Sequence, residues 1–177
     1  MKNIRMAMGL LFLMLSVSMA GKTASPLQVF FTMKQVFPEL KEASIFISKE
    51  VFEAEKTQIS RAALQTQIQA QVYPIDSPKD ISKHLRNMAD ESVLIVLAGG
   101  ILDDKSSKLY ILSKCKERKI AIVTNSADYT ESGATLGVVA GEDGKMAPVL
   151  NLKHSPHLKA KLSQAMLQKA GIAQVIE

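Results

Sequence analysis

The stretch Ser92–Gly100 constrains the fold more than any other part of this sequence. Its apolar run does not alternate with polar residues, so a strand built from it is buried on both faces. Such a run predicts a central strand of a parallel sheet. It ends at Gly99 and Gly100, where the chain can turn sharply or approach a ligand closely. In open α/β sheets, ligands bind at the carboxyl ends of such strands.

Helical and extended segments alternate along the rest of the chain. Strands are expected at 43–48, 71–75, 92–97, 120–124, 134–140 and 145–150. Helices are expected at 26–37, 51–70, 77–89, 103–119 and 155–171. This alternation implies a parallel sheet covered by helices on both faces, and right-handed crossovers favour the strand order 2-1-3-4-5. We therefore expect a three-layer, Rossmann-like α/β domain with a C-terminal β-hairpin and a final helix.

Turn and cap residues set the limits of these elements. Ser77-Pro78 and Ser155-Pro156 each place a capping serine before a proline, which is a strong helix start. Gly141–Gly144 joins two extended runs and predicts the β-hairpin. Pro148 lies in the second of these runs, and because proline cannot donate to a ladder, it predicts an edge strand.

The N-terminus has the layout of a secretory signal peptide. Lys2 and Arg5 precede an apolar run that ends with Ser18-Met19-Ala20, small residues at the positions a signal peptidase reads. We expect residues 1–20 to be this signal and residues 21–177 to form a single exported, periplasmic domain. The alternative is an uncleaved membrane anchor. Removal of the signal lowers the formal net charge from +5 by the two charges of Lys2 and Arg5.

Composition and motifs argue against several classes of function. The positive excess lacks aromatic-rich basic clusters, so no nucleic-acid partner is expected. The only cysteine, Cys115, excludes an internal disulfide. The chain has neither a phosphate-binding glycine motif nor G-x-S-x-G. We therefore expect that this protein is not an enzyme and binds no cofactor.

Three further residue arrangements argue against other kinds of site. A phosphoacceptor receiver domain needs acidic residues where Ser48-Lys49 and Gly99-Gly100 stand. Asp103-Asp104 could bind a cation but more often caps a helix. His154 and His157 lack a third ligand nearby.

Neutral polar residues follow the predicted strands. The strand order reverses between the first and third strands, so a crevice is expected between the loop after Ser48 and the Gly99-Gly100 loop. Neutral hydrogen-bonding groups there suit a small polar ligand better than catalysis. Ordinary loop polarity and a tight turn at the glycines are the alternatives. The candidate ligand-binding residues are Ser48, Gly99, Gly100, Thr124, Asn125 and Ser126.

The chain resembles the C-terminal lobe of periplasmic substrate-binding proteins of ABC transporters, in the family of tryptophan- and tyrosine-linked import systems. The resemblance spans residues 27–137 and the tail from Met146 to Gly171. It rests on Phe37-Pro38-Glu39-Leu40, Ser77-Pro78-Lys79-Asp80, the strands at 94–98 and 120–123, Glu131-Ser132-Gly133-Ala134 and Pro148-Val149-Leu150-Asn151-Leu152. It implies a non-enzymatic protein that binds a small polar ligand and works with an inner-membrane permease. The family has two such lobes and this chain has room for one, so two copies could associate as a homodimer.

A second resemblance concerns the hairpin and the tail. Gly144-Lys145 and Asn151-Leu152, followed by a final helix, are similar to the small periplasmic YfiR-type proteins. That resemblance implies a regulator that contacts the sensor domain of a membrane diguanylate cyclase. The paired cysteines of those proteins are absent, so redox control is not expected.

Overall fold

The computed structural model describes residues 23–141, 143–172 and 174–177. The expected signal peptide, residues 1–20, lies outside the described residues. The strands are β1 (Glu42–Ser48), β2 (Gln69–Ile75), β3 (Val93–Leu97), β4 (Ala121–Thr124), β5 (Leu136–Ala140), β6 (Met146–Asn151) and β7 (Gln174–Ile176). The α-helices are α1 (Pro26–Val36), α2 (Lys49–Thr66), α3 (Pro78–Asn87), α4 (Lys105–Glu117), α5 (Ala127–Ser132) and α6 (Gln164–Lys169). Two 3₁₀ helices, η1 (Gly100–Asp103) and η2 (Pro156–Lys161), complete the set.

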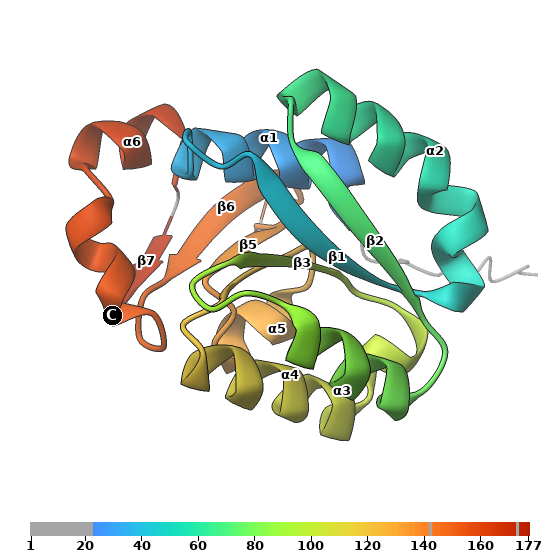
Figure 1. Ribbon diagram of the computed structural model, residues 1–177. Coiled ribbons are helices and arrows are strands. Elements are labelled where there is room, and N and C mark those ends of the chain that lie inside the picture. Colours follow the sequence, from blue (N-terminus) through green and yellow to red (C-terminus); the bar gives the residue numbers. More distant parts are fainter. Residues whose placement is uncertain (1–22, 142, 173) are drawn as a thin grey trace, which may run out of the picture.

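All strands join one sheet in the order β2-β1-β3-β4-β5-β6-β7. The strands from β1 to β5 pair in parallel, and β6 pairs antiparallel with β5. Helices α1, α2 and α6 lie on one face and α3, α4 and α5 on the other (Figure 1). This arrangement confirms the mostly parallel α/β fold and the predicted order 2-1-3-4-5.

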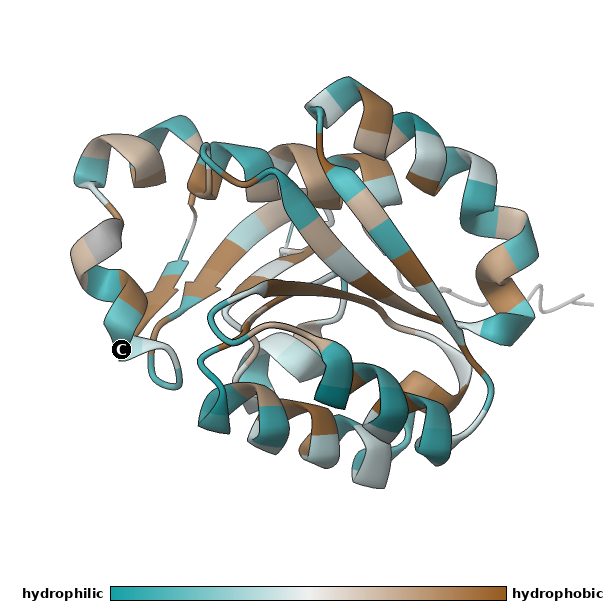
Figure 2. Ribbon diagram, in the orientation of Figure 1, coloured by the Kyte–Doolittle hydropathy of each residue, from teal (hydrophilic) through white to brown (hydrophobic). Residues whose placement is uncertain are grey.

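Strand β3 is the central strand that the sequence predicts. It pairs with β1 on one side and β4 on the other, and all five of its residues are buried. Val93, Ile95 and Leu97 face the core beneath α1 and α2, whereas Leu94 and Val96 face the core above α3 and α4. The central strands are accordingly among the most hydrophobic parts of the ribbon (Figure 2). Burial on both faces explains the lack of polar alternation.

One prediction is wrong at the β6-β7 end of the sheet. The hairpin between β5 and β6 is present, but β6 is not an edge strand, because β7 pairs with it in parallel. The β7 pairing covers only Val149 to Asn151. Pro148 therefore lies just before the part of β6 that pairs with β7, where its missing N–H costs no ladder hydrogen bond. The segment Gln174–Ile176 is too short for its pattern to predict a strand.

Helix α2 ends earlier than expected, and Ala70 belongs to β2. The reason is Gln67, which adopts a left-handed conformation with φ of 55°. The N–H of the next residue, Ile68, donates to the Ala63 carbonyl at 3.0 Å, which closes the helix end. Glycine usually fills this position, and a glutamine gives no such signal.

Two other predicted helices differ from the structure. The helix expected at 103–119 is α4 alone, which begins at Lys105 because Asp104 is extended with ψ of 132° and separates it from η1. The segment 155–171 is η2 followed by α6, and Ser163 starts the second helix by accepting the Met166 N–H at 3.2 Å. In both cases a residue with capping chemistry lies inside a continuous apolar pattern.

Candidate ligand-binding site

The loop after β3 sits directly on the end of β1. Ser48, the last residue of β1, is 2% exposed. A Cβ built on Gly100 would lie only 2.4 Å from the Ser48 Oγ, and Gly100 has a left-handed φ of 52°. Both the contact and the backbone conformation require glycine here. The Gly99-Gly100 turn therefore packs directly against the end of β1, as a tight turn does, and a ligand-binding crevice between the two loops stays a prediction.

Asn125 fastens three chain segments at the same edge. Its Oδ1 accepts the Ala98 N–H at 2.9 Å, just after β3. Its Nδ2 donates to the Ala24 carbonyl at 3.4 Å, just before α1. The amide thus ties the ends of β3 and β4 to the start of α1.

The hydroxyls of Thr124 and Ser126 shape the loop after β4. The Oγ1 of Thr124, which is fully buried, accepts the Ser126 N–H at 3.1 Å. The Oγ of Ser126 accepts the Tyr129 N–H at 3.3 Å and caps α5. These hydrogen bonds explain why polar residues stand at the end of a buried strand.

The structure brings all six predicted residues to the carboxyl edge of β1, β3 and β4. We use the name carboxyl-edge crevice for the crevice that the sequence predicts at this edge. Gly100 is exposed, and Gly99, Asn125 and Ser126 are half-buried. The chemistry available there is neutral hydrogen bonding from the backbone loop and from Asn125. Contact with a ligand at these six residues stays a prediction.

Charged residues lie at the rim of this crevice. The Glu50 Oε2 would lie 3.1 Å from a Cβ on Gly100. Lys49 and Asp76 form an exposed ion pair at 2.9 Å, and the hydrogen bond to Asp76 raises the pKa of Lys49. Charges of both signs therefore stand next to the neutral site residues.

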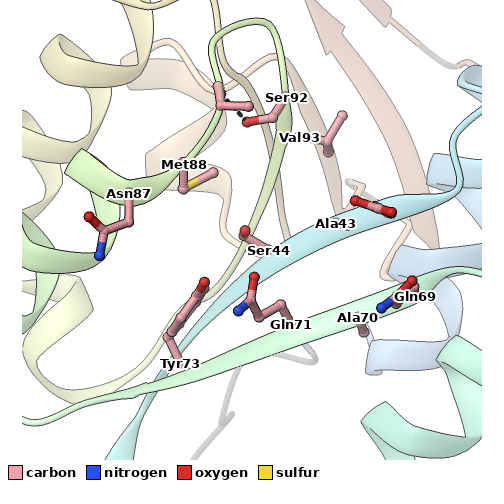
Figure 3. Close-up of a pocket in the computed structure, with 12 residues that line it drawn as sticks. Ala43, Ser44, Gln69, Ala70, Gln71, Tyr73, Asn87, Met88, Ser92 and Val93 are labelled. Atoms are coloured by element: carbon pink, nitrogen blue, oxygen red, sulfur yellow. Dashed lines mark hydrogen bonds between the residues drawn. The ribbon is translucent and has the colours of Figure 1, made fainter.

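A second hollow lies at the opposite, amino-terminal edge of the sheet, and the sequence analysis missed it. It has a volume of about 370 Å³ and lies between β1, β2, β3 and the end of α3. Asn87 and Met88 at the end of α3 lie across the hollow from Gln71 and Tyr73 on β2 (Figure 3). The neutral polar side chains that line it are Ser44, Gln69, Gln71, Tyr73, Asn87 and Ser92.

Most of these side chains have hydrogen-bonding capacity to spare. Ser92 donates to the Ala89 carbonyl at 2.6 Å. The side chains of Gln71, Tyr73 and Asn87 form no hydrogen bond within the described residues. Tyr73 is instead held by its ring, 4.2 Å from the His84 ring and edge-on to Phe46 at 6.0 Å. His84 is thus half-buried in an aromatic cluster with Tyr73 and Phe46.

One sequence signal could have pointed to this hollow. The chain carries no charged residue from Ala62 to Ile75, although 22% of the protein is charged. The switch-point rule places ligands at the carboxyl ends of strands. The hollow lies at the other end.

Other candidate groups are buried or isolated. Cys115 is fully buried, and burial raises the pKa of its thiol to about 12, so it is not an activated nucleophile. His154 lies against Gly133, and partial burial lowers its pKa. Among the described residues, no group of three or more His, Cys, Asp or Glu side chains could hold a metal ion. None of the helices in the described ranges has the length and apolar character to span a membrane.

Comparison with known proteins bears on what this geometry does. No protein-family model and no curated protein sequence matches the chain. Among solved structures, a conserved domain protein from Vibrio cholerae matches with a TM-score of 0.70 and 14% identity, over 87% of this chain and 61% of its own. A Streptococcus pneumoniae ABC domain in complex with L-Trp matches with a TM-score of 0.69 and 14% identity, over 86% and 61%.

A substrate-binding protein with adhesive properties from Clostridium difficile, in its ligand-free open form, matches with a TM-score of 0.61 and 13% identity, over 86% of this chain and 60% of its own. The chain shares its fold with the matched part of these three structures. This confirms the first resemblance at the level of fold. The match spans about three fifths of the length of each of these proteins.

Proposed function

We propose that this protein is an exported, periplasmic, non-enzymatic binding protein that holds a small polar ligand at the carboxyl-edge crevice. One observation carries the proposal: most of the chain superimposes on substrate-binding structures, one of them with L-Trp bound. The neutral polar edge built from Ser48, Gly99-Gly100 and Asn125 suits recognition of such a ligand. An inner-membrane permease would be the partner of a protein of this kind.

A thermal-shift screen tests the proposal directly. The mature chain, residues 21–177, would be screened against amino acids, including L-tryptophan, and against sugars and nucleosides. A ligand at 100 times its dissociation constant adds about 2.7 kcal/mol of stability. For a domain of this size that corresponds to a rise in Tm of roughly 5–10 °C. If no compound from any class shifts the Tm, the proposal fails.

A matched pair of variants locates the site. Asn125→Ala removes the amide at the carboxyl-edge crevice, and Asn87→Ala removes an exposed amide in the hollow at the other edge. We expect Asn125→Ala to weaken binding at least tenfold and Asn87→Ala to leave it unchanged. If Asn87→Ala weakens binding and Asn125→Ala does not, the ligand binds in the hollow at the amino-terminal edge of the sheet, which we call the amino-edge hollow.

A second function is favoured by a different observation. An apolar groove of about 380 Å³ lies between the end of α1 and the tail, with Phe37, Leu158 and Met166 among its walls. This tail carries the resemblance to YfiR-type regulators. The alternative is therefore a regulator that contacts the sensor domain of a membrane signalling enzyme.

Two substitutions in α6 test the alternative. Met166→Glu places a charge in the groove, whereas Gln168→Glu adds the same charge at an exposed position on the same helix. A regulator would lose control of the signalling enzyme only with Met166→Glu. If both variants regulate as the wild type does, the groove is not the contact surface.

A further inference from the structure

The free edge of β2 differs from ordinary edge strands. β2 is a seven-residue terminal strand, paired only with β1. Native proteins usually protect such edges with charged side chains, bulges or proline. Here β2 and the end of α2, the helix that precedes it, contain no charged residue from Ala62 to Ile75. Pro74 is the one protective residue, and it stands near one end.

The backbone of β2 defines which groups face outward. The Gln69 N–H donates to the Lys41 carbonyl at 2.7 Å, so Gln69 points its backbone groups toward β1. In a parallel ladder the direction alternates from residue to residue. Ala70, Val72 and Pro74 therefore point outward. Within the described residues, no hydrogen bond uses the outward N–H groups of Ala70 and Val72.

We propose that two copies of this chain associate by antiparallel pairing of their β2 edges into one continuous sheet. The two-fold axis passes through Gln71. Ala70 of one copy then exchanges both outward hydrogen bonds with Val72 of the other, and the symmetric pair does the same. Pro74, which has no N–H to donate, falls outside these hydrogen-bonded pairs.

Charge favours a second copy as the occupant of this edge. The chain is net positive, so two copies repel where basic surfaces meet. The β2 edge is neutral, and pairing it with itself places amides against amides. Gln71 faces its own equivalent and Gln69 faces Tyr73 of the other copy. Neither pairing places like charges opposite each other, which would be destabilising.

The pairing has a consequence for the amino-edge hollow. A two-fold axis perpendicular to the sheet keeps α3 and α4 on the same side in both copies. The two hollows, each lined by Gln69, Gln71 and Tyr73, then adjoin across the seam. The carboxyl-edge crevices point in opposite directions, so this dimer does not rebuild a two-lobed clamp. The inference is thus independent of the proposed ligand function.

Charge substitutions at the axis test the pairing by sedimentation equilibrium and light scattering. Gln71→Glu and Gln71→Lys each place like charges face to face and should weaken self-association about tenfold or more. Mixing the two variants should restore a heterodimer. Gln58→Glu, at an exposed position on α2, should leave association unchanged. A wild type that stays monomeric at millimolar concentration, or a Gln71→Glu variant that associates as the wild type does, overturns the proposal.

Disulfide trapping tests the register. Residues that face each other in a non-hydrogen-bonded antiparallel pair have Cα atoms about 4.5 Å apart, within disulfide range. Gln71→Cys should therefore cross-link two copies on mild oxidation. In Gln69→Cys the two thiols lie four positions apart along the strands and should not cross-link. The native Cys115 is buried and does not compete. Equal cross-linking of both variants would contradict this register.

Discussion

Gln67 carries a conformational cost that the sequence does not reveal. Its φ of 55° places a side chain in the left-handed region at the end of α2. We expect Gln67→Gly to raise the free energy of unfolding by about 0.5–1 kcal/mol, since glycine adopts this conformation without a Cβ clash. Urea denaturation at neutral pH measures the change.

The same substitution elsewhere in α2 is the control. Gln58 is also exposed but lies in the helix interior. Gln58→Gly should lower the free energy of unfolding by about 1 kcal/mol. Changes of the same sign for the two variants would show that residue 67 is not strained.

The predicted site residues show what a residue pattern can and cannot give. Polar residues after strands were correctly placed at one edge, because strand order and strand ends follow from hydrophobic runs and turn residues. Which polar groups remain free for a ligand depends on hydrogen bonds between distant segments. Asn125 bonding to Ala98 and Ala24 is such a case. No local pattern predicts it.

At the scale of elements, Arg118 links α3 to the end of α4. Its guanidinium donates to the Leu85 and Met88 carbonyls, which terminate α3. It also pairs with Asp90 at 2.6 Å. A cation at these carbonyls satisfies acceptors that the helix leaves unpaired and complements its dipole. The contact explains how a short amphipathic helix is held against its neighbour.

Removal of this link should loosen the α3–α4 layer. We expect Arg118→Ala to lower the free energy of unfolding by about 1–2 kcal/mol. Arg118→Lys should recover less than half, because one ammonium cannot reach both carbonyls and Asp90. Asp90→Ala should change stability by less than about 0.5 kcal/mol, since the Asp90 carboxylate is largely exposed. A large effect of Asp90→Ala with a small effect of Arg118→Ala would contradict this account.

Element order was predictable and element ends were not. The strands from β1 to β6 and the helices α1 to α4 follow from apolar runs, capping serines and prolines. The short helix α5 was not among the expected helices. The ends of α2, η1 and α6 depend on single residues with unusual backbone angles or caps, such as Gln67 and Asp104. β7 pairs over only three residues, and a long-range pairing of that length leaves no periodic signal.

At the scale of the whole molecule, two buried groups in the core between the sheet and helices α3 and α4 should make the protein less stable at alkaline pH. Cys115 is fully buried there, and burial raises the pKa of its thiol from 9.0 to about 12. Tyr129 is 1% exposed in the same cluster. Its hydroxyl donates to the Leu102 carbonyl at 2.6 Å. Burial, followed by the Asp103 and Asp128 carboxylates, raises the pKa of Tyr129 above 10.0.

Both shifts act in the same direction. The unfolded chain releases these protons near pH 9 and 10, whereas the folded chain retains them. The stabilisation is thus complete below the unfolded pKa values and is lost as the pH rises toward the folded ones. Each group lowers the free energy of unfolding by up to about 1.4 kcal/mol per pH unit within its window. We therefore expect the urea midpoint of the wild type to fall steeply between pH 9 and 11.

Two variants separate the contributions. Cys115→Ala and Tyr129→Phe should both be less stable than the wild type at pH 8, because one leaves a cavity and the other removes a hydrogen bond. Above pH 9 the Cys115→Ala curve should be flatter than that of the wild type, and above pH 10 the Tyr129→Phe curve should be flatter. Curves parallel to the wild type would assign the alkaline loss to the exposed lysines instead. The slopes decide the question, because a simple packing defect shifts every point equally.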